Sequence, residues 1–319
     1  MKVRCDYCYH ECALGEGQRG ICFIRVNRGG EVITENYGEV VALGLDPVEK
    51  KPLYHFRPGS HTLSVALFGC NLSCSFCQNY QISQHEFYQQ RPNRYISPEV
   101  FIQRAMEEKA SVSFTYSEPL VWQDYMLDCA HLAKEEGIPT ILVSSGTFSK
   151  AALSRIIPFI DAYSIDLKGN ESFYRRYCKG SAKPVIESLQ TLANTPAVLE
   201  VTTLLIEGEH TLEDVKELGV ILEELGVQVW HLSRYHPAYK LNLPPTSESF
   251  LNEALSLAKE FRIPHIYGGN TSQEQDTFCP VCNTLLIKRT PGAIKQYLAN
   301  GRCSCSHQLY GDMMGPTLL

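Results

Sequence analysis

Cysteine is the residue type in this sequence with the clearest capacity for chemistry. Of 13 cysteines among 319 residues, only Cys129 and Cys178 stand apart from the others. The rest form three clusters, which are Cys5, Cys8, Cys12 and Cys22; Cys70, Cys74 and Cys77; and Cys279, Cys282, Cys303 and Cys305. Because the first residues lack the apolar core of a signal peptide, we expect a cytoplasmic protein whose thiols stay reduced. Clustered cysteines there indicate metal or redox chemistry, whereas the two isolated ones are expected to be small buried hydrophobic residues.

The central cluster has the spacing C-x3-C-x2-C, with Phe76 directly before its last cysteine. Three thiolates on one tight loop can ligate three of the irons of a cubane [4Fe-4S] cluster. The fourth iron is then open to an exogenous donor, such as the amino and carboxylate groups of S-adenosylmethionine (SAM). One electron would cleave a carbon–sulfur bond of SAM and release a 5′-deoxyadenosyl radical. The alternative is a structural zinc loop, but zinc prefers four ligands, and no fourth ligand lies close to this loop in the sequence.

The segments that must position this loop alternate between strands and helices. Expected strands cover residues 63–68, 111–116, 140–144, 162–167, 198–206, 228–232 and 265–267. Ser97 and Pro98 open the first expected helix, and further helices are expected over 122–136, 149–160, 171–177, 184–193, 211–225 and 247–261. This alternation predicts βαβ units around a parallel sheet. Six or seven units favour an α/β fold with a partial or complete barrel over a flat doubly wound sheet.

The remaining segments complete the expected domain organisation. Residues 1–30 are expected to be loop-like, and residues 31–56 form a β-rich connector. We therefore expect a Cys-rich metal-binding segment over residues 1–58, the barrel over residues 59–272 and a Cys-rich ribbon over residues 273–319.

Polar residues follow the expected strands, at the barrel rim where α/β barrels carry their chemistry. They are Ser117 and Glu118; Ser144, Ser145 and Thr147; Asp166 and Lys168; His231, Arg234, Tyr235 and His236; and Asn270. Glu118 is favoured as a ligand contact over a plain surface acid. Asp166 and Lys168 form either a buried ion pair between strands or, as the resemblance described below implies, a contact with the SAM carboxylate or a bound monovalent cation. The serines either cap the next helix or bind ribose.

The residues after the last strands are candidates for substrate binding or catalysis. An arginine fork suits a carboxylate or phosphate, so Arg234 and His236 are better candidates than His231, which fits a satisfied core histidine. Tyr235 belongs to the same polar set. Asn270 reaches either adenine or substrate, or else belongs to a plain turn.

The loop from Cys70 to Cys77 resembles the signature of the radical SAM superfamily. Ser117-Glu118-Pro119 resembles that superfamily's second-strand motif, which implies that Glu118 binds the methionyl amino group. Asp166, Lys168 and Ser145 resemble positions in the branch that contains pyruvate formate-lyase-activating enzyme. The resemblance implies SAM contacts from Phe76, Ser117, Glu118, Ser145, Asp166 and Lys168.

More narrowly, residues 17–22, 46–56, 68–84 and 231–241 resemble AmmeMemoRadiSam-system radical SAM enzymes. This resemblance implies a [4Fe-4S] cluster, SAM, a low-potential electron donor such as ferredoxin or flavodoxin, and Memo-type partner proteins. The sequence departs from that family at Cys303-Ser-Cys305, where a Cys-x-x-Cys knuckle is usual.

The two terminal cysteine sets are expected to bind metals. Cys279 and Cys282 with Cys303 and Cys305 are typical of a ribbon that holds zinc or rubredoxin-type iron, with His307 as a further candidate ligand. The four cysteines between residues 5 and 22 match either zinc or an auxiliary iron–sulfur cluster. The spacing of these four cysteines does not distinguish zinc from an iron–sulfur cluster.

Composition argues against some functions. The net charge of −6 gives no basic face for nucleic acid, and no stretch of about 18 apolar residues exists for a membrane span. We therefore expect a radical SAM enzyme acting on an unidentified substrate. The alternatives are an activase that installs a glycyl radical in a partner protein, and a non-catalytic iron–sulfur or zinc protein for electron transfer or interaction.

Overall fold

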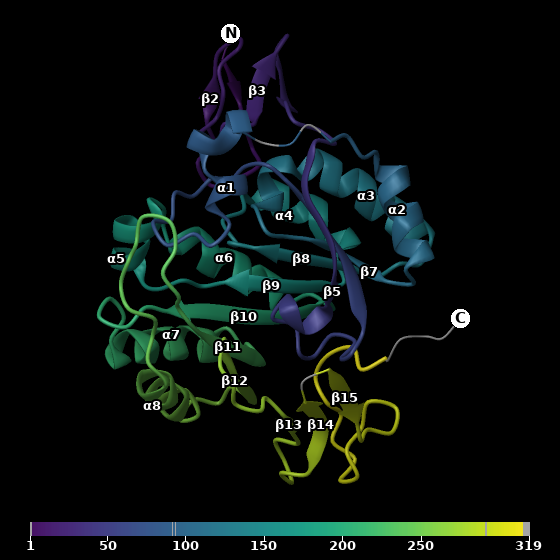
Figure 1. Ribbon diagram of the computed structural model, residues 1–319, viewed down its shortest axis with the longest axis vertical. Helices are drawn as coiled ribbons and strands as arrows, with labels where there is room; N and C mark the ends of the chain where they lie inside the picture. The colour runs from purple at the N-terminus through teal and green to yellow at the C-terminus, as the bar shows by residue number, and fades with distance from the viewer. Residues whose placement is uncertain (1, 91, 93, 291, 315–319) are drawn as a thin grey trace.

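The computed structural model describes residues 2–90, 92, 94–290 and 292–314, and one eight-stranded sheet forms its centre (Figure 1). The strand order is β12-β11-β10-β9-β8-β7-β6-β5, in which β6 to β12 run parallel and β5 is an antiparallel edge strand. The strands are β5 (Val40–Pro47), β6 (His61–Leu67), β7 (Ser111–Phe114), β8 (Thr140–Ser144), β9 (Ala162–Asp166), β10 (Val198–Leu205), β11 (Val229–Arg234) and β12 (His265–Gly269). Each parallel strand pairs with the next one along the chain, without the reversal of a doubly wound sheet. The predicted α/β partial barrel is confirmed.

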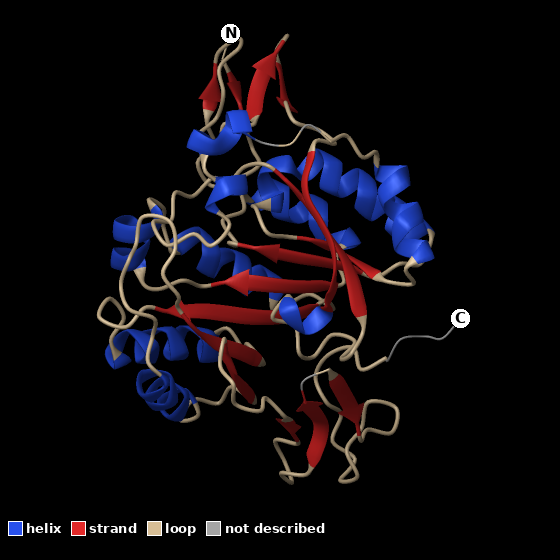
Figure 2. Ribbon diagram, in the orientation of Figure 1, coloured by secondary structure: helices blue, strands red, loops and turns tan. Residues whose placement is uncertain are grey.

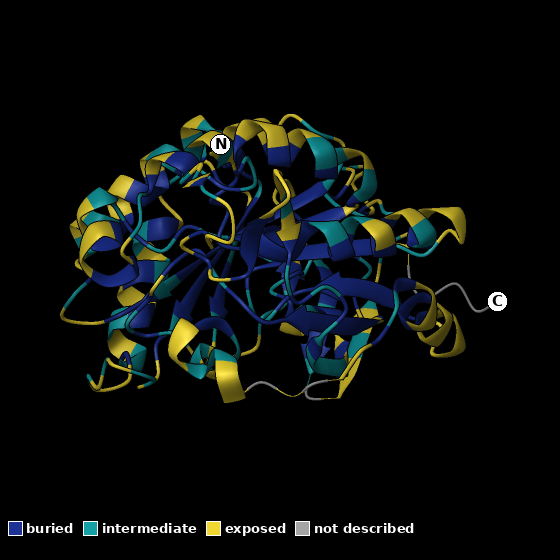
Figure 3. Cartoon of the chain, turned by 90° about the horizontal axis from the view of Figure 1, so that it is seen from above, coloured by how far each residue is buried: buried dark blue, intermediate teal, exposed yellow. Residues whose placement is uncertain are grey.

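Helices connect the parallel strands and form an outer layer with exposed outer faces around buried strands (Figures 2 and 3). They are α1 (Tyr80–Ser83), α2 (Pro98–Glu107), α3 (Gln123–Glu135), α4 (Lys150–Ile156), α5 (Glu171–Phe173), α6 (Lys183–Leu192), α7 (Leu212–Glu224) and α8 (Glu248–Ala258). The Ser97 side chain accepts a hydrogen bond from the Val100 amide, as the sequence predicted for this helix start. Residues 174–178, which were expected to be helical, form a π-helical turn, a form often found at functional sites.

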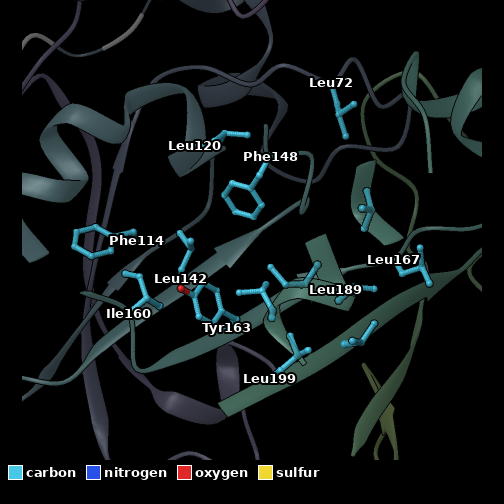
Figure 4. Close-up of a cluster of buried hydrophobic side chains, with 14 of the residues drawn as sticks. Leu72, Phe114, Leu120, Leu142, Phe148, Ile160, Tyr163, Leu167, Leu189 and Leu199 are labelled. Atoms are coloured by element: carbon cyan, nitrogen blue, oxygen red, sulfur yellow. The ribbon is translucent and has the colours of Figure 1, made fainter. Parts of the chain in front are cut away.

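The core lies between the sheet and the helices (Figure 4). Leu142 and Tyr163 from neighbouring strands are fully buried there together with Leu189 from α6. Leu72, which lies between two cysteines of the central loop, joins the same cluster and is 3% exposed. The central loop is therefore anchored in the core through an apolar side chain of its own.

The two ends of the chain form small β structures at opposite ends of the molecule (Figure 1). The N-terminal part holds two hairpins, β1 (Val3–Arg4) with β2 (Ala13–Leu14) and β3 (Arg25–Arg28) with β4 (Glu31–Thr34). The expectation of a purely loop-like segment over residues 1–30 was wrong, because strands of two to four residues are too short to show a periodic pattern. The C-terminal ribbon contains β13 (Thr277–Phe278), β14 (Leu285–Thr290) and β15 (Ala293–Gln296). None of the described helices is long and apolar enough to cross a bilayer.

Candidate active site at the carboxyl ends of the strands

A cavity of about 470 Å³ opens at the carboxyl ends of β6 to β11. Eleven residues singled out from the sequence line this single cavity; they are Cys70, Cys74, Phe76, Cys77, Ser117, Glu118, Ser144, Ser145, Asp166, Lys168 and Asn270. They come from five separate βα loops. The structure therefore brings together groups that lie up to 200 residues apart in the sequence, since Cys70 and Asn270 both face this space.

Backbone hydrogen bonds with residues 177 and 178 hold the central cysteine loop in place. The amides of Ser73 and Ser75 donate to the carbonyl groups of Cys178 and Tyr177, both at 2.9 Å. These carbonyl groups belong to the π-helical turn, in which the widened backbone directs them toward the loop. The turn thus fixes the loop in place and brings Cys178, which the sequence marked as isolated, next to it.

Of the three central thiols, Cys74 is buried, and Cys70 and Cys77 are half-buried at the cavity. Burial raises the pKa of Cys70 well above its usual value, and the carboxylate of Glu118 adds to this shift. A hydrogen bond with Cys178, followed by burial, raises the pKa of Cys74 in the same direction. Burial also raises the pKa of Cys77. Thiolates at these positions therefore require a bound cationic group.

Glu118 lies at the centre of the hydrogen-bond network beside the cysteines and is 3% exposed. Its carboxylate accepts hydrogen bonds from the Ser144 hydroxyl at 2.6 Å and from the Ser145 amide at 2.8 Å. Its own amide donates to the Gly69 carbonyl at 3.0 Å, which ties the second strand's loop to the cysteine loop. Burial raises the pKa of Glu118, while the hydrogen bonds from the serines oppose that shift. Ser117 donates to the Leu67 carbonyl, so it joins the same two loops.

Asp166 and Lys168 form an ion pair on the opposite wall, with Nζ to Oδ2 at 2.6 Å. The Lys168 side chain is 14% exposed and that of Asp166 is 37% exposed. Although burial opposes the shift, the Asp166 and Cys74 side chains raise the pKa of Lys168 well above its usual value. Lys168 therefore stays protonated at the cavity wall, with its charge balanced by Asp166.

A third group of polar residues at the cavity was not singled out individually from the sequence. Lys50 and Lys51 both donate to the Asp46 carboxylate at 2.7 Å, and Tyr116 also donates to it. Although burial opposes the shift, the two lysines lower the pKa of Asp46. Lys50, Lys51 and Tyr116 line the cavity. Lys50 and Lys51 lie in the stretch 46–56, whose resemblance to a known family was the sequence feature that could have indicated a functional role for them.

The His231 and Arg234 side chains are not among the described residues that line the cavity. His231 is 2% exposed, and its Nε2 lies 2.7 Å from the Glu200 carboxylate. Arg234 uses its fork within the protein, with Nη1 at 2.5 Å from Glu248 and Nε donating to the Thr246 carbonyl at 2.6 Å. This placement favours the core interpretation of His231 and gives Arg234 a role in fixing the start of α8.

Tyr235 and His236 also lie away from the cavity lining of the described structure. Tyr235 is fully buried and donates to the Leu241 carbonyl at 2.6 Å. His236 is exposed, and its carbonyl accepts a hydrogen bond from Gln78 at 2.8 Å. Asn270 alone of the predicted substrate residues lines the cavity, where its amide donates to the Arg234 carbonyl at 2.8 Å.

The C-terminal cysteines form a compact group at the far end of the molecule. All four Sγ atoms lie within 4.8 Å of one another, with 3.6 Å between Cys279 and Cys305 and 3.4 Å between Cys282 and Cys303. Tetrahedral bonds of about 2.3 Å to a single ion place sulfur atoms about 3.8 Å apart. A hydrogen bond from Thr284 lowers the pKa of Cys282 to about 6, so this thiol is ionised at neutral pH. The group can therefore hold one metal ion without His307.

A model of the radical SAM superfamily matches residues 65–219 of the chain, the part that contains the central cysteine loop and the walls of the cavity. The chain is also 37% identical over 297 residues to the uncharacterized protein MJ0808 of Methanocaldococcus jannaschii, covering 90% of this chain and 88% of that protein. The chain belongs to the radical SAM superfamily. Members of this superfamily are enzymes, and membership implies SAM and a [4Fe-4S] cluster.

More distant matches agree on the fold of this radical SAM chain. The putative glycyl-radical enzyme activating enzyme MJ1227 of the same organism is 20% identical over 217 residues, which are 64% of this chain and 87% of that protein. The crystal structure of Streptococcus suis SuiB bound to S-adenosylmethionine has a TM-score of 0.53 at 12% identity. That match covers 65% of this chain and 49% of SuiB, so the chain spans about half of SuiB. At this identity the likeness concerns the fold alone.

Proposed function

We propose that this protein cleaves SAM reductively at a [4Fe-4S] cluster ligated by Cys70, Cys74 and Cys77. When bound, such a cluster supplies one electron to SAM and thereby yields a 5′-deoxyadenosyl radical that abstracts hydrogen from a substrate. The observation that carries the proposal is the convergence of three thiols from one loop with Glu118 and the Asp166–Lys168 pair on one cavity.

The donor set at the cavity fits this group. The three thiols are free and line the cavity, and no fourth cysteine is among the described residues that line it. The buried hydroxyl of Thr202, which faces the cavity, has no hydrogen-bond partner in the protein. A buried hydroxyl without a partner is costly, so it supports a polar ligand in this space.

The remaining lining residues would bind and orient SAM. The Glu118 carboxylate, held in place by Ser144 and Ser145, would accept hydrogen bonds from the methionyl amino group. Lys168 would face the SAM carboxylate, and Asp166 holds Lys168 in position. Phe76, at 4% exposure, would exclude water from the thiols beside it.

The test is anaerobic reconstitution with iron and sulfide, followed by addition of a reductant and SAM. We expect the protein to form 5′-deoxyadenosine, and the variant C70S/C74S/C77S to form none. Absence of 5′-deoxyadenosine from the wild-type protein with a filled cluster would support the non-catalytic electron-transfer or interaction protein instead.

A second candidate is an activase that generates a glycyl radical in a partner protein. The likeness to the putative glycyl-radical enzyme activating enzyme MJ1227 favours it. The same cavity would serve this reaction, and only the substrate differs. A glycyl radical signal in a partner protein after incubation with SAM and reductant would support this candidate.

The narrower proposal concerns the biological system. The stretches that resemble AmmeMemoRadiSam-system enzymes support a role beside Memo-type proteins, with a ferredoxin or flavodoxin as the electron donor. Co-purification of the chain with a Memo-type protein encoded near its gene tests this association. A failure of that test would leave SAM cleavage unaffected.

A further inference from the structure

The four N-terminal cysteines converge although their strands are short. The Cys5 amide donates to the Cys12 carbonyl at 2.9 Å across the first hairpin. A Cβ atom built on Gly20 would lie 3.6 Å from the Cys12 sulfur and 3.7 Å from the Cys22 sulfur, so both thiols face this glycine. Cys5, Cys8 and Cys22 are no more than 6% exposed. Burial raises the pKa of Cys5 to about 11, and the Cys22 and Cys12 thiols nearby add to this shift.

These thiols lie further apart than the C-terminal ones. Among the described residues, Cys279, Cys282, Cys303 and Cys305 form the one group of three or more potential ligand atoms that lie within 4.8 Å of one another. The N-terminal cysteines and the cysteines of the central loop do not come this close together. A single tetrahedral ion needs the closer spacing. In a [4Fe-4S] cluster the thiolates lie further apart, because each binds a different iron. The N-terminal thiols, which exceed the limit that the C-terminal thiols meet, therefore favour such a cluster over a single ion.

A buried arginine beside this set lacks a partner for one of its donors. Arg25 is 0% exposed, its Nη1 lies 2.6 Å from Asp124, and its Nε donates to the Val121 carbonyl at 2.7 Å. Its Nη2 is buried without any hydrogen-bond partner in the protein. The Arg25 Cβ atom lies 3.8 Å from the same Gly20 Cβ position that the Cys12 and Cys22 sulfur atoms approach, so the arginine lies beside this set. Sulfur atoms of a bound cluster would accept the unpaired N–H group, and such hydrogen bonds set cluster potentials.

The N-terminal set also touches the central cysteine loop. His10, two residues after Cys8, contacts this loop, and its Nε2 lies 3.1 Å from the carbonyl oxygen of Asn71, which directly follows Cys70. One hydrogen bond thus connects the segment that carries Cys8 to the residue next to a thiol of the central loop. The C-terminal site has no such connection, since it lies at the opposite end of the molecule (Figure 1).

We propose that Cys5, Cys8, Cys12 and Cys22 hold an iron–sulfur cluster that delivers electrons to the cluster of the central loop. One electron enters from a low-potential one-electron donor such as reduced flavodoxin, and one electron leaves toward the central loop, so the N-terminal cluster returns to its starting oxidation state. Cys12 is partly exposed, so a donor can approach this edge. The delivery of electrons rests on the proposed function, whereas the presence of the cluster does not.

The cluster itself is tested by metal analysis of the full-length variant C70S/C74S/C77S after anaerobic reconstitution. We expect four irons with four acid-labile sulfides in the N-terminal set. Addition of C12S to this variant should lower that content, whereas addition of C129S, at an isolated cysteine, should not. If the triple variant fails to fold, C12S in the wild-type background should lose the same irons. A second zinc ion, beyond the one ion that the C-terminal site holds, in place of iron and sulfide would overturn the proposal.

The relay is tested by the rate at which flavodoxin reduces the central cluster, followed by electron paramagnetic resonance. In C5S/C8S/C12S/C22S we expect this rate to fall by at least about tenfold, which is about 1.4 kcal/mol in activation free energy. Direct reduction by dithionite should still load the central cluster. An unchanged rate with flavodoxin would refute the relay, and a wild-type protein that reduces its cluster but does not cleave SAM would refute the proposed function alone.

Discussion

Substitution of Glu118 by glutamine is the most informative single change at the cavity. The carboxylate is buried and accepts hydrogen bonds from Ser144, from the Ser145 amide and from the Leu120 amide at 3.2 Å. A glutamine amide can donate to the Ser144 hydroxyl but to neither backbone amide, so its orientation is constrained. The charge-assisted hydrogen bond to the SAM amino group would be lost. Such a bond contributes about 1.5–3 kcal/mol, which corresponds to a rise in Kd of about 10- to 150-fold.

The assay is SAM binding to reconstituted protein by anaerobic equilibrium dialysis. Glu248→Gln is the matched control, because Glu248 binds Arg234 and does not line the cavity. Because burial raises the pKa of Glu118, wild-type SAM affinity should fall as the pH drops through that raised value, and E118Q should lack this dependence. Equal affinity of E118Q and wild-type protein, at equal iron content, would refute the role assigned to Glu118.

Three further predictions concern stability and metal content. Lys168→Met should lower the free energy of unfolding by about 1 kcal/mol, because Asp166 loses its partner but is 37% exposed and can be solvated. Chemical denaturation of this variant and of the double variant with Asp166→Asn, which should recover part of the loss, checks this. Cys282→Ser should remove one metal ion per chain without stopping SAM cleavage, as measured by metal analysis and 5′-deoxyadenosine formation. Burial lowers the pKa of His265 to about 4, so the stability that its neutral form contributes is present above pH 6.5. The free energy of unfolding should fall by about 2 kcal/mol when the pH is lowered to 5. This pH dependence should be smaller in His265→Gln, and an equal dependence would contradict the assignment.

Much of the sheet and of the cavity could be predicted because both follow from local patterns. Apolar runs of strand length alternate with amphipathic helices, and this alternation gives a parallel sheet in chain order. In such a sheet the carboxyl ends of the strands share one edge, so polar residues after each strand must meet there. Glu118, Lys168 and Asn270 line one cavity for this reason.

Contacts between distant segments could not be predicted from local patterns. His231 looked like a candidate for chemistry, but its partner Glu200 lies on the neighbouring strand, and only the strand register brings the two within 2.7 Å. The fork of Arg234 is occupied by Glu248, which begins the following helix. The position of Lys51 at the cavity depends on the edge strand that pairs antiparallel with the first barrel strand. None of these pairings leaves a spacing signal in the sequence.

The central claim is that one iron of the cluster at residues 70–77 is free to bind SAM. Electron–nuclear double resonance of the reduced protein with SAM labelled with ¹⁵N at its amino group measures this directly. We expect a hyperfine coupling between the labelled nitrogen and the cluster, and its weakening in E118Q. A filled, reduced cluster that shows no coupling to the bound label would contradict the account.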